Sequence, residues 1–275
     1  METLTQEEQA LLDEALREND TRNIIPVNSR TISQNIATSR FSSAEWYAKA
    51  REQYVVLAGV GGIGGYVGFL LARLGILQII MYDPDTVGEE NMSGQLYGRG
   101  DIGNSKVTAL STFLREYADM SNTSLIALNE PYESNSLTKN IMICGFDNME
   151  ARKTFFKAWK LHTMSKTDEI KAECLFIDGR LSAEEFQIFC IKGNDEKAIE
   201  VYEKEWLFDD REAEETVCSY KQTTFCANMI ASYMVNCFVN FIANQCGLII
   251  DRDVPFKIYY DAKNMIFKVI EPWQL

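Results

Sequence analysis

Residues 54–83, YVVLAGVGGIGGYVGFLLARLGILQIIMYD, constrain the fold of this chain more than any other stretch. An apolar run, a glycine-rich turn, an apolar amphipathic segment and a second apolar run ending in Asp83 predict the order strand, loop, helix, strand. The turn lets the backbone approach a phosphate, and the following helix offers free N–H groups at its positive end. Asp83 is placed to bind a ribose hydroxyl, so the stretch indicates nucleotide binding; the alternative is a packing turn without a ligand. The glycines that such a ligand requires are Gly59, Gly61, Gly62 and Gly64.

Shorter apolar runs predict further strands at residues 125–128, 141–144, 174–178 and 186–191, the last of them antiparallel. Helical periodicity lies between them, at residues 106–116 and 149–161. The segments PFKIYYD and MIFKVI predict a C-terminal hairpin. Together these elements predict an α/β fold: a Rossmann-like, mainly parallel sheet with helices on both faces, plus a C-terminal antiparallel extension.

The domain organisation follows from the same patterns. Residues 1–41 predict an N-terminal helix and an extended arm, and residues 42–275 a single Rossmann-like domain. An insertion at about residues 193–216 is dense in Asp and Glu. We interpret this acidic segment either as a solvated, partly helical excursion or as a mobile loop that crosses over the site.

The charge and cysteine content limit the partners and the compartment. A formal net charge of −13 and a pI of about 4.7 disfavour nucleic acid and anionic membrane surfaces. The acidic N-terminal stretch is neither a secretory signal nor a basic transit peptide. Seven cysteines, an odd number without a CxxC or CxxH pair, favour a reducing cytoplasm and predict no zinc site. Residues 225–243 carry no charge, but their three asparagines favour a buried core helix over a membrane span.

The chemistry follows from residues at the predicted strand ends. Ligands of open parallel sheets bind outside the carboxyl ends of the strands, so the glycine loop, Asp83 and Asp147 should converge. A nicotinamide dehydrogenase would explain the glycine loop and Asp83, but it would give Lys106 and Asp147 no role. Breaking the α–β bond of ATP requires hydrogen-bonding or cationic groups and a carboxylate for magnesium. Asn91, Gln95 and Lys106 supply the first kind of group, and Asp147 supplies the second.

Four spaced motifs carry a family resemblance. GVGGIGG, the DPDTVGEEN segment at 83–91, QLYGRGDIGNSK at 95–106 and CGFDN at 144–148 resemble the ThiF/MoeB and ubiquitin-activating adenylating superfamily, over about residues 40–245. The resemblance implies a homodimeric enzyme in which the C-terminal carboxylate of a ubiquitin-like or sulfur-carrier protein or peptide attacks the α-phosphate of ATP. Magnesium assists, pyrophosphate leaves and an acyl-adenylate remains.

The resemblance also implies roles for single residues. Asp83 would bind the ribose of ATP, Asn91, Gln95 and Lys106 the phosphates, and Asp147 the magnesium ion. Asp85 is a further candidate for binding the cofactor. Arg40 matches an arginine that the arm lends across the homodimer; the alternative is a solvated arginine. Cys218 stands where ThiF-like members carry the cysteine that captures the adenylate; the alternative is an ordinary loop cysteine.

Two departures from the family pattern stand out. Gly94 replaces the usual arginine before Gln95, and the paired CxxC zinc motifs are missing. The first departure keeps open a non-catalytic nucleotide-binding or heterodimerising subunit of the same fold. Asp178 and Arg180, in IDGR, either face the crevice or form a structural ion pair. His162 is the only histidine and has no Ser/Asp partner signature, which disfavours a catalytic triad.

Overall fold

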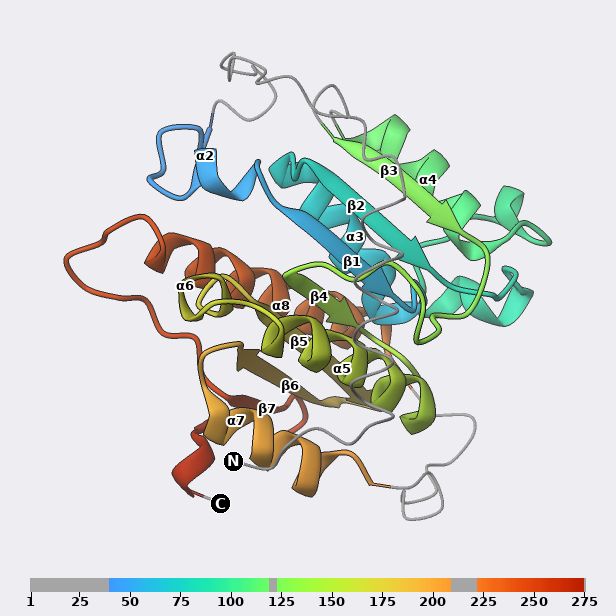
Figure 1. Ribbon diagram of the computed structural model, residues 1–275. Helices are drawn as coiled ribbons and strands as arrows, with labels where there is room; N and C mark the ends of the chain where they lie inside the picture. The colour runs from blue at the N-terminus through green and yellow to red at the C-terminus, as the bar shows by residue number, and fades with distance from the viewer. Residues whose placement is uncertain (1–39, 119–122, 209–221, 275) are drawn as a thin grey trace.

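The computed structural model describes residues 40–118, 123–208 and 222–274. Its centre is an eight-stranded sheet in the order β3-β2-β1-β4-β5-β6-β7-β8 (Figure 1). The first five strands are parallel: β1 (Tyr54–Ala58), β2 (Gln78–Tyr82), β3 (Ser124–Leu128), β4 (Ile141–Cys144) and β5 (Leu175–Ser182). The last three are antiparallel: β6 (Glu185–Lys192), β7 (Lys257–Asp261) and β8 (Ile266–Ile270). The predicted mainly parallel sheet with an antiparallel extension is confirmed.

Helices cover both faces of the sheet (Figure 1). One face carries α3 (Gly62–Leu74), α4 (Lys106–Tyr117) and α8 (Thr224–Asn244). The opposite face carries α5 (Met149–Met164) and α7 (Glu196–Val201). Shorter helices are α2 (Tyr47–Ala50), α6 (Asp168–Lys171), a π-helix at Tyr202–Trp206 and 3-10 turns at Glu89–Ser93, Arg99–Asp101 and Pro272–Gln274.

The central strand β1 shows why two helical layers are needed. Val55 and Leu57 belong to the hydrophobic cluster under α3 and α8, whereas Val56 and Ala58 belong to the cluster under α5. Successive side chains of a strand point to opposite faces, so an apolar run without alternation needs cover on both sides. All four residues are fully buried.

The uncharged helix α8 packs as a core helix. By length and composition alone it would qualify as a membrane span, and 56% of its most apolar window is buried inside the protein. Ala227, Ile230, Met234 and Phe238 are fully buried in the cluster shared with α3 and the sheet. Its apolar character therefore serves packing between α3 and the strands β5 and β6.

The acidic segment begins as helix rather than loop. Ala198 and Tyr202 are buried against the sheet, while Glu196, Glu200 and Glu203 of the same turns are exposed. The spacing of three to four residues between the buried positions gives this stretch an apolar stripe. Residues 209–221, including Cys218, and residues 1–39 of the N-terminal arm lie outside the described residues.

The glycine turn joins β1 to α3 by a backbone contact that leaves no room for a side chain. Gly59 has a φ of +76°, in the left-handed region that favours glycine. A Cβ on Gly64, in the first turn of α3, would lie 1.8 Å from the carbonyl oxygen of Gly59. The start of the helix is therefore pressed directly onto the end of the strand.

Gly64→Ala should destabilise the protein, although alanine ordinarily stabilises a helix interior by about 1 kcal/mol relative to glycine. Overpacking against rigid backbone costs about 1–3 kcal/mol and outweighs that gain. Urea denaturation of Gly64→Ala and of the wild type measures the effect. Gly100→Ala is the control, because a Cβ at Gly100 would meet no atom within 4 Å. Equal stability of Gly64→Ala and the wild type would contradict the tight contact.

His162 lies in the last turn of α5, partly buried, with Nε2 2.9 Å from Asn140 Oδ1. Burial, reinforced by Lys166 and Lys139, lowers the pKa of His162 to about 4. The unfolded chain therefore binds more protons than the folded protein between about pH 6.5 and pH 4. Acidification through that window costs stability.

We expect the wild type to lose about 2 kcal/mol more stability than His162→Gln between pH 7.5 and pH 4.5. Glutamine keeps a donor for Asn140 but does not titrate. Chemical denaturation at both pH values measures the difference, which is assignable because the chain has one histidine. The same pH dependence in both proteins would contradict a buried neutral imidazole.

Candidate functional site

The carboxyl ends of three parallel strands meet around the glycine turn. The Gly59 N–H donates to the carbonyl of Tyr82 at the end of β2, and the Gly145 N–H donates to that of Ala58 at the end of β1. The loops after β1, β2 and β4 therefore start side by side. These loops carry Gly59–Gly64, Asp83 and Asp147, so the expected convergence is present in the backbone.

Asp83 ties the end of β2 to the glycine turn. Its Oδ2 accepts the Val60 N–H at 2.8 Å, and its Oδ1 accepts the Asp85 N–H at 2.9 Å. The side chain is 5% exposed, and burial raises the pKa of this carboxyl while the two N–H donors act in the opposite direction. Each carboxylate oxygen keeps a second lone pair, which leaves acceptor capacity for a hydroxyl.

Lys106 begins α4 and points back to the same loop. Its Nζ lies 2.7 Å from Asp85 Oδ2, and its backbone N–H donates to the Asp85 carbonyl at 2.9 Å. Lys106 is 8% exposed, whereas the Asp85 side chain is 61% exposed. The ammonium is thus held at the surface edge of the site by a carboxylate that faces solvent.

Asn91 and Gln95 lie in the segment between Asp85 and α4. Asn91 Oδ1 accepts the Gly88 N–H at 2.8 Å, and the Gln95 N–H donates to the Asn91 carbonyl at 3.0 Å. The Gln95 side chain faces Gly61, where a Cβ would lie 3.6 Å from Gln95 Oε1. This Oε1 is buried and has no hydrogen-bond partner among the described residues. Asn91 therefore has a structural bond already, while Gln95 has an unused acceptor against the glycine loop.

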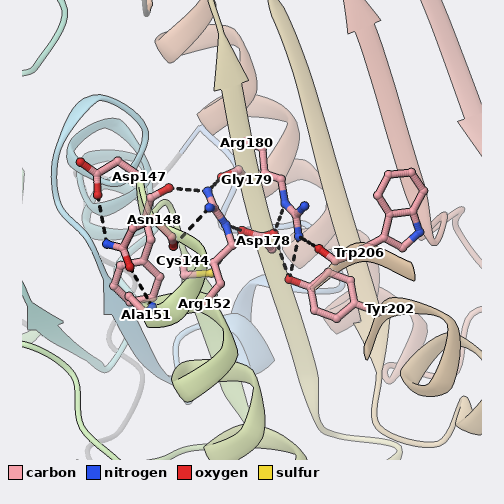
Figure 2. Close-up of polar contacts among 11 residues, drawn as sticks. Cys144, Asp147, Asn148, Ala151, Arg152, Asp178, Gly179, Arg180, Tyr202 and Trp206 are labelled. Atoms are coloured by element: carbon pink, nitrogen blue, oxygen red, sulfur yellow. Dashed lines mark hydrogen bonds and ion pairs between the residues drawn. The ribbon is translucent and has the colours of Figure 1, made fainter. Parts of the chain in front are cut away.

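Asp147 is exposed in the turn between β4 and α5 (Figure 2). Its Oδ1 accepts the Asn148 side-chain amide at 3.2 Å, and Asn148 Oδ1 caps α5 through the Ala151 N–H at 2.8 Å. In the part of the chain that the structure describes, no group of three or more His, Cys, Asp or Glu is close enough to enclose a metal ion. A cation here would rest on Asp147, on phosphate oxygens and on water, which suits Mg²⁺.

A buried charge cluster lies beside this turn (Figure 2). The fully buried Asp178 on β5 accepts from Arg152 Nε at 2.9 Å, Arg180 Nε at 2.6 Å and the Tyr202 hydroxyl at 3.0 Å. Arg152 also donates to the carbonyls of Phe146 and Asn148, which flank Asp147. The backbone around Asp147 is therefore fastened to the cluster by one guanidinium group.

The cluster settles the two interpretations of the IDGR segment in favour of an ion pair. Burial by itself would raise the pKa of Asp178, but Arg152 and Arg180 outweigh it and hold the pKa well below its usual range. Burial and the neighbouring Asp178 carboxylate raise the pKa of the Cys144 thiol, whose Sγ lies 3.4 Å from Asp178 Oδ1. Cys144 is thus a poor nucleophile, as expected for a strand cysteine.

The structure does not bring Arg40 to the site within one chain, and one further predicted site residue falls outside the described ranges. Arg40 is exposed at the start of the described residues, next to Phe41, which stacks on Trp46 and meets Tyr47 edge to face around α2. The helix α2 precedes β1 and so lies at the opposite end of the strand from the glycine turn (Figure 1). Cys218 lies outside the described residues.

Three contributors were not predicted from the sequence. Tyr97 donates its hydroxyl to the Val60 carbonyl at 2.6 Å and so braces the glycine turn. Arg152 forms the cluster described above, and Gln222 lies against Gly62 and Gly94. Only Arg152 had a local signal, because it sits four residues after the Asn148 cap, on the first turns of α5.

Comparisons with known proteins agree with this architecture. A model of the ThiF family matches residues 32–273. Ubiquitin-like modifier-activating enzyme 5 of Drosophila willistoni is 32% identical over 112 residues, and that of Caenorhabditis elegans is 37% identical over 83 residues. These matches cover 41% and 30% of this chain and span only 28% and 20% of those two proteins.

Solved structures share the fold at low identity. PaaA superposes with a TM-score of 0.63 at 15% identity, over 98% of this chain and 83% of that protein. Escherichia coli MccB, in a crystal structure with ATP, superposes with a TM-score of 0.61 at 16% identity, over 88% of this chain and 72% of that protein. The likeness establishes the arrangement of strands and helices.

Asp178→Asn should destabilise the protein by about 3–5 kcal/mol, because it leaves two buried guanidinium groups without their carboxylate. The difference should stay constant from pH 8 to pH 5 and shrink only in stronger acid, since a lowered pKa keeps Asp178 ionised there. Asp168→Asn is the control, because its ion pair with Lys171 at 3.0 Å is exposed and should contribute nothing measurable. Equal urea midpoints for both variants would refute the role of the cluster.

Proposed function

Because this chain belongs to the ThiF family, we propose that it uses ATP to adenylate the C-terminal carboxylate of a ubiquitin-like protein, a sulfur-carrier protein or a peptide. The name of its curated relatives, ubiquitin-like modifier-activating enzyme, supports this substrate class. The observation that carries the proposal is the contact set around the glycine turn. Asp83 bonds Val60 of the turn and Asp85, and Asp85 in turn pairs with Lys106.

The nucleotide would span these groups from β3 to α3. The ribose hydroxyls would bind the remaining lone pairs of Asp83, and the phosphates would extend over the N-terminus of α3 toward Gln95 and Lys106. A cavity of about 300 Å³ beside Tyr82, Leu128 and Pro131 lies at the ends of β2 and β3 and would take the base. Asp85 holds the Lys106 ammonium until phosphate oxygens compete for it.

The proposed step is a displacement at the α-phosphorus. A carboxylate oxygen of the substrate forms a bond to this phosphorus, the bond to the bridging oxygen of the β-phosphate breaks, and pyrophosphate leaves with the electron pair. Lys106, the Gln95 amide and the N–H groups at the start of α3 would stabilise the charge that develops on the phosphate oxygens. The product is a mixed anhydride of the C-terminus and AMP.

Magnesium fits the acidic turn after β4. Asp147 would hold the ion with its exposed carboxylate, and the ion would neutralise phosphate charge when bound. Arg152 would keep the Asp147 turn in place, because it bonds the carbonyls on both sides of that residue. Gln95 Oε1, which has no hydrogen-bond partner among the described residues, is a further acceptor for a water against the glycine loop.

The assembly and the later steps extend the proposal. We propose a cytoplasmic homodimer in which Arg40 of one chain reaches the site of its partner, since Arg40 is remote from the site of its own chain. The adenylate then passes to a thiol, and Cys218 is the candidate nucleophile for a thioester. Both steps are separable from adenylation.

ATP–pyrophosphate exchange, with candidate carboxylate substrates, tests the central step. We expect Asp147→Ala to lower exchange by about 10²-fold, because it removes the metal-binding carboxylate without disturbing a buried contact. Glu150→Ala is the matched control, since Glu150 is an exposed acid three residues further along α5, and it should keep wild-type exchange. Full exchange in Asp147→Ala would show that the metal assignment is wrong.

The wild-type result separates the rival functions. ATP binding without exchange for any carboxylate substrate would indicate the non-catalytic subunit that Gly94 suggests. Binding of NAD without binding of ATP, measured by calorimetry, would indicate a nicotinamide-dependent oxidoreductase.

A further inference from the structure

Gln222 lies close to the start of α3 and to the segment that ends at Gly94. It precedes α8 and forms an isolated parallel bridge with Ala183. Two residues later, the hydroxyl of Thr224 donates to the Ser93 carbonyl. Ser93 ends the 3-10 turn before Gly94. The chain entering α8 is therefore fastened onto the segment that carries Asn91 and Gln95.

The Gln222 side chain occupies the space that two glycines leave open. A Cβ on Gly62, the first residue of α3, would lie 2.2 Å from Gln222 Oε1. A Cβ on Gly94 would lie 2.6 Å from Gln222 Nε2, and its three nearest atoms would all belong to Gln222. The carboxamide thus bridges from the start of the helix to the end of the Asn91 segment, and its nitrogen lies within 3.0 Å of the Cβ positions of both glycines.

The polar groups around this carboxamide are suited to an anion. The N-terminus of α3 has no side-chain cap and no acidic residue in its first turn. Gln95 faces Gly61 in the same way as Gln222 faces Gly62, so two neutral amides flank the positive end of the helix. Within the described residues, no hydrogen bond engages the Gln222 amide. Its N–H groups are available to a phosphate oxygen.

We propose that Gln222 is a phosphate-binding residue for the nucleotide, and that Gly62 and Gly94 lack side chains so that its carboxamide fits between them. This inference rests on the proposed function, since it assigns a residue to the ATP site. The amide supplies a donor without adding charge at the start of α3. It also couples the nucleotide to the entry of α8, which carries the Gln222 backbone.

Calorimetric titration with Mg·ATP tests the assignment. Gln222→Ala should raise the Kd about 10-fold, as expected for loss of a hydrogen bond to a charged group. Gln222→Glu should bind more weakly still, because it adds a negative charge beside the phosphates. Adenosine, which lacks phosphate, should bind all three proteins equally. Gln274→Ala is the control, since that side chain is exposed near the C-terminus.

A double-mutant cycle checks the geometry. Gly94→Ala should displace only the flexible end of Gln222 and so raise the Kd for Mg·ATP, whereas adding it to Gln222→Ala should raise the Kd no further. Thermal melting without nucleotide confirms that each variant is folded.

Each remaining outcome overturns the assignment. Unchanged ATP binding in Gln222→Ala refutes it, and tighter binding shows instead that Gln222 blocks the phosphate position. An equal loss of adenosine and ATP binding indicates a structural role only. A wild-type protein that binds no ATP refutes the proposed function itself, which distinguishes the two failures.

Discussion

The contact between Gly64 and the Gly59 carbonyl is the constraint on which the rest of the site depends. Because no side chain separates them, α3 starts directly above the end of β1 and its free N–H groups lie at the carboxyl edge of the sheet. Two further bonds hold the turn from either side: Asp83 accepts the Val60 N–H, and Tyr97 donates to the Val60 carbonyl. A ligand would therefore meet a rigid turn whose amides are already oriented, which reduces the ordering cost of binding.

The opposite half of the site depends on a buried charge instead of a backbone contact. Asp178 lies beside Cys144 in the register of β4 and β5, and this fully buried carboxylate holds the buried Arg152 and the partly buried Arg180. Arg152 connects this cluster to the Asp147 turn, so an exposed carboxylate is positioned by a fully buried one. Removing a partner from such a cluster is costly, whereas the intact cluster fixes one geometry. The two halves meet because β1 lies between β2 and β4.

Prediction succeeded where local pattern and tertiary environment agree. The apolar run at 141–144 coincides with β4, because a strand covered on both faces has no polar position. The predicted strand at 174–178 was too short, because β5 continues to Ser182. This polar second half is a strand because it pairs with β6. The ammonium of Lys106 was predicted beside phosphate, but its ion pair with Asp85 spans 21 positions and has no sequence pattern. The acidic segment was interpreted either as a solvated, partly helical excursion or as a mobile loop; its first part is helical, and Tyr202 within it is fully buried.

The sequence alone was enough to predict the order of strands and helices, the glycine turn and the polar residues that follow β1, β2 and β4. These features depend on the spacing of apolar residues, on turn residues and on the spacing of motifs, all of which are local properties of the chain. The tertiary structure decided which distant groups meet. Arg152 reaches Asp178 and the Asp147 turn, and Gln222 enters the gap between Gly62 and Gly94, only after the sheet has aligned their segments. Contacts of this kind depend on the packing of elements that are far apart in the chain. No local sequence pattern reports that packing.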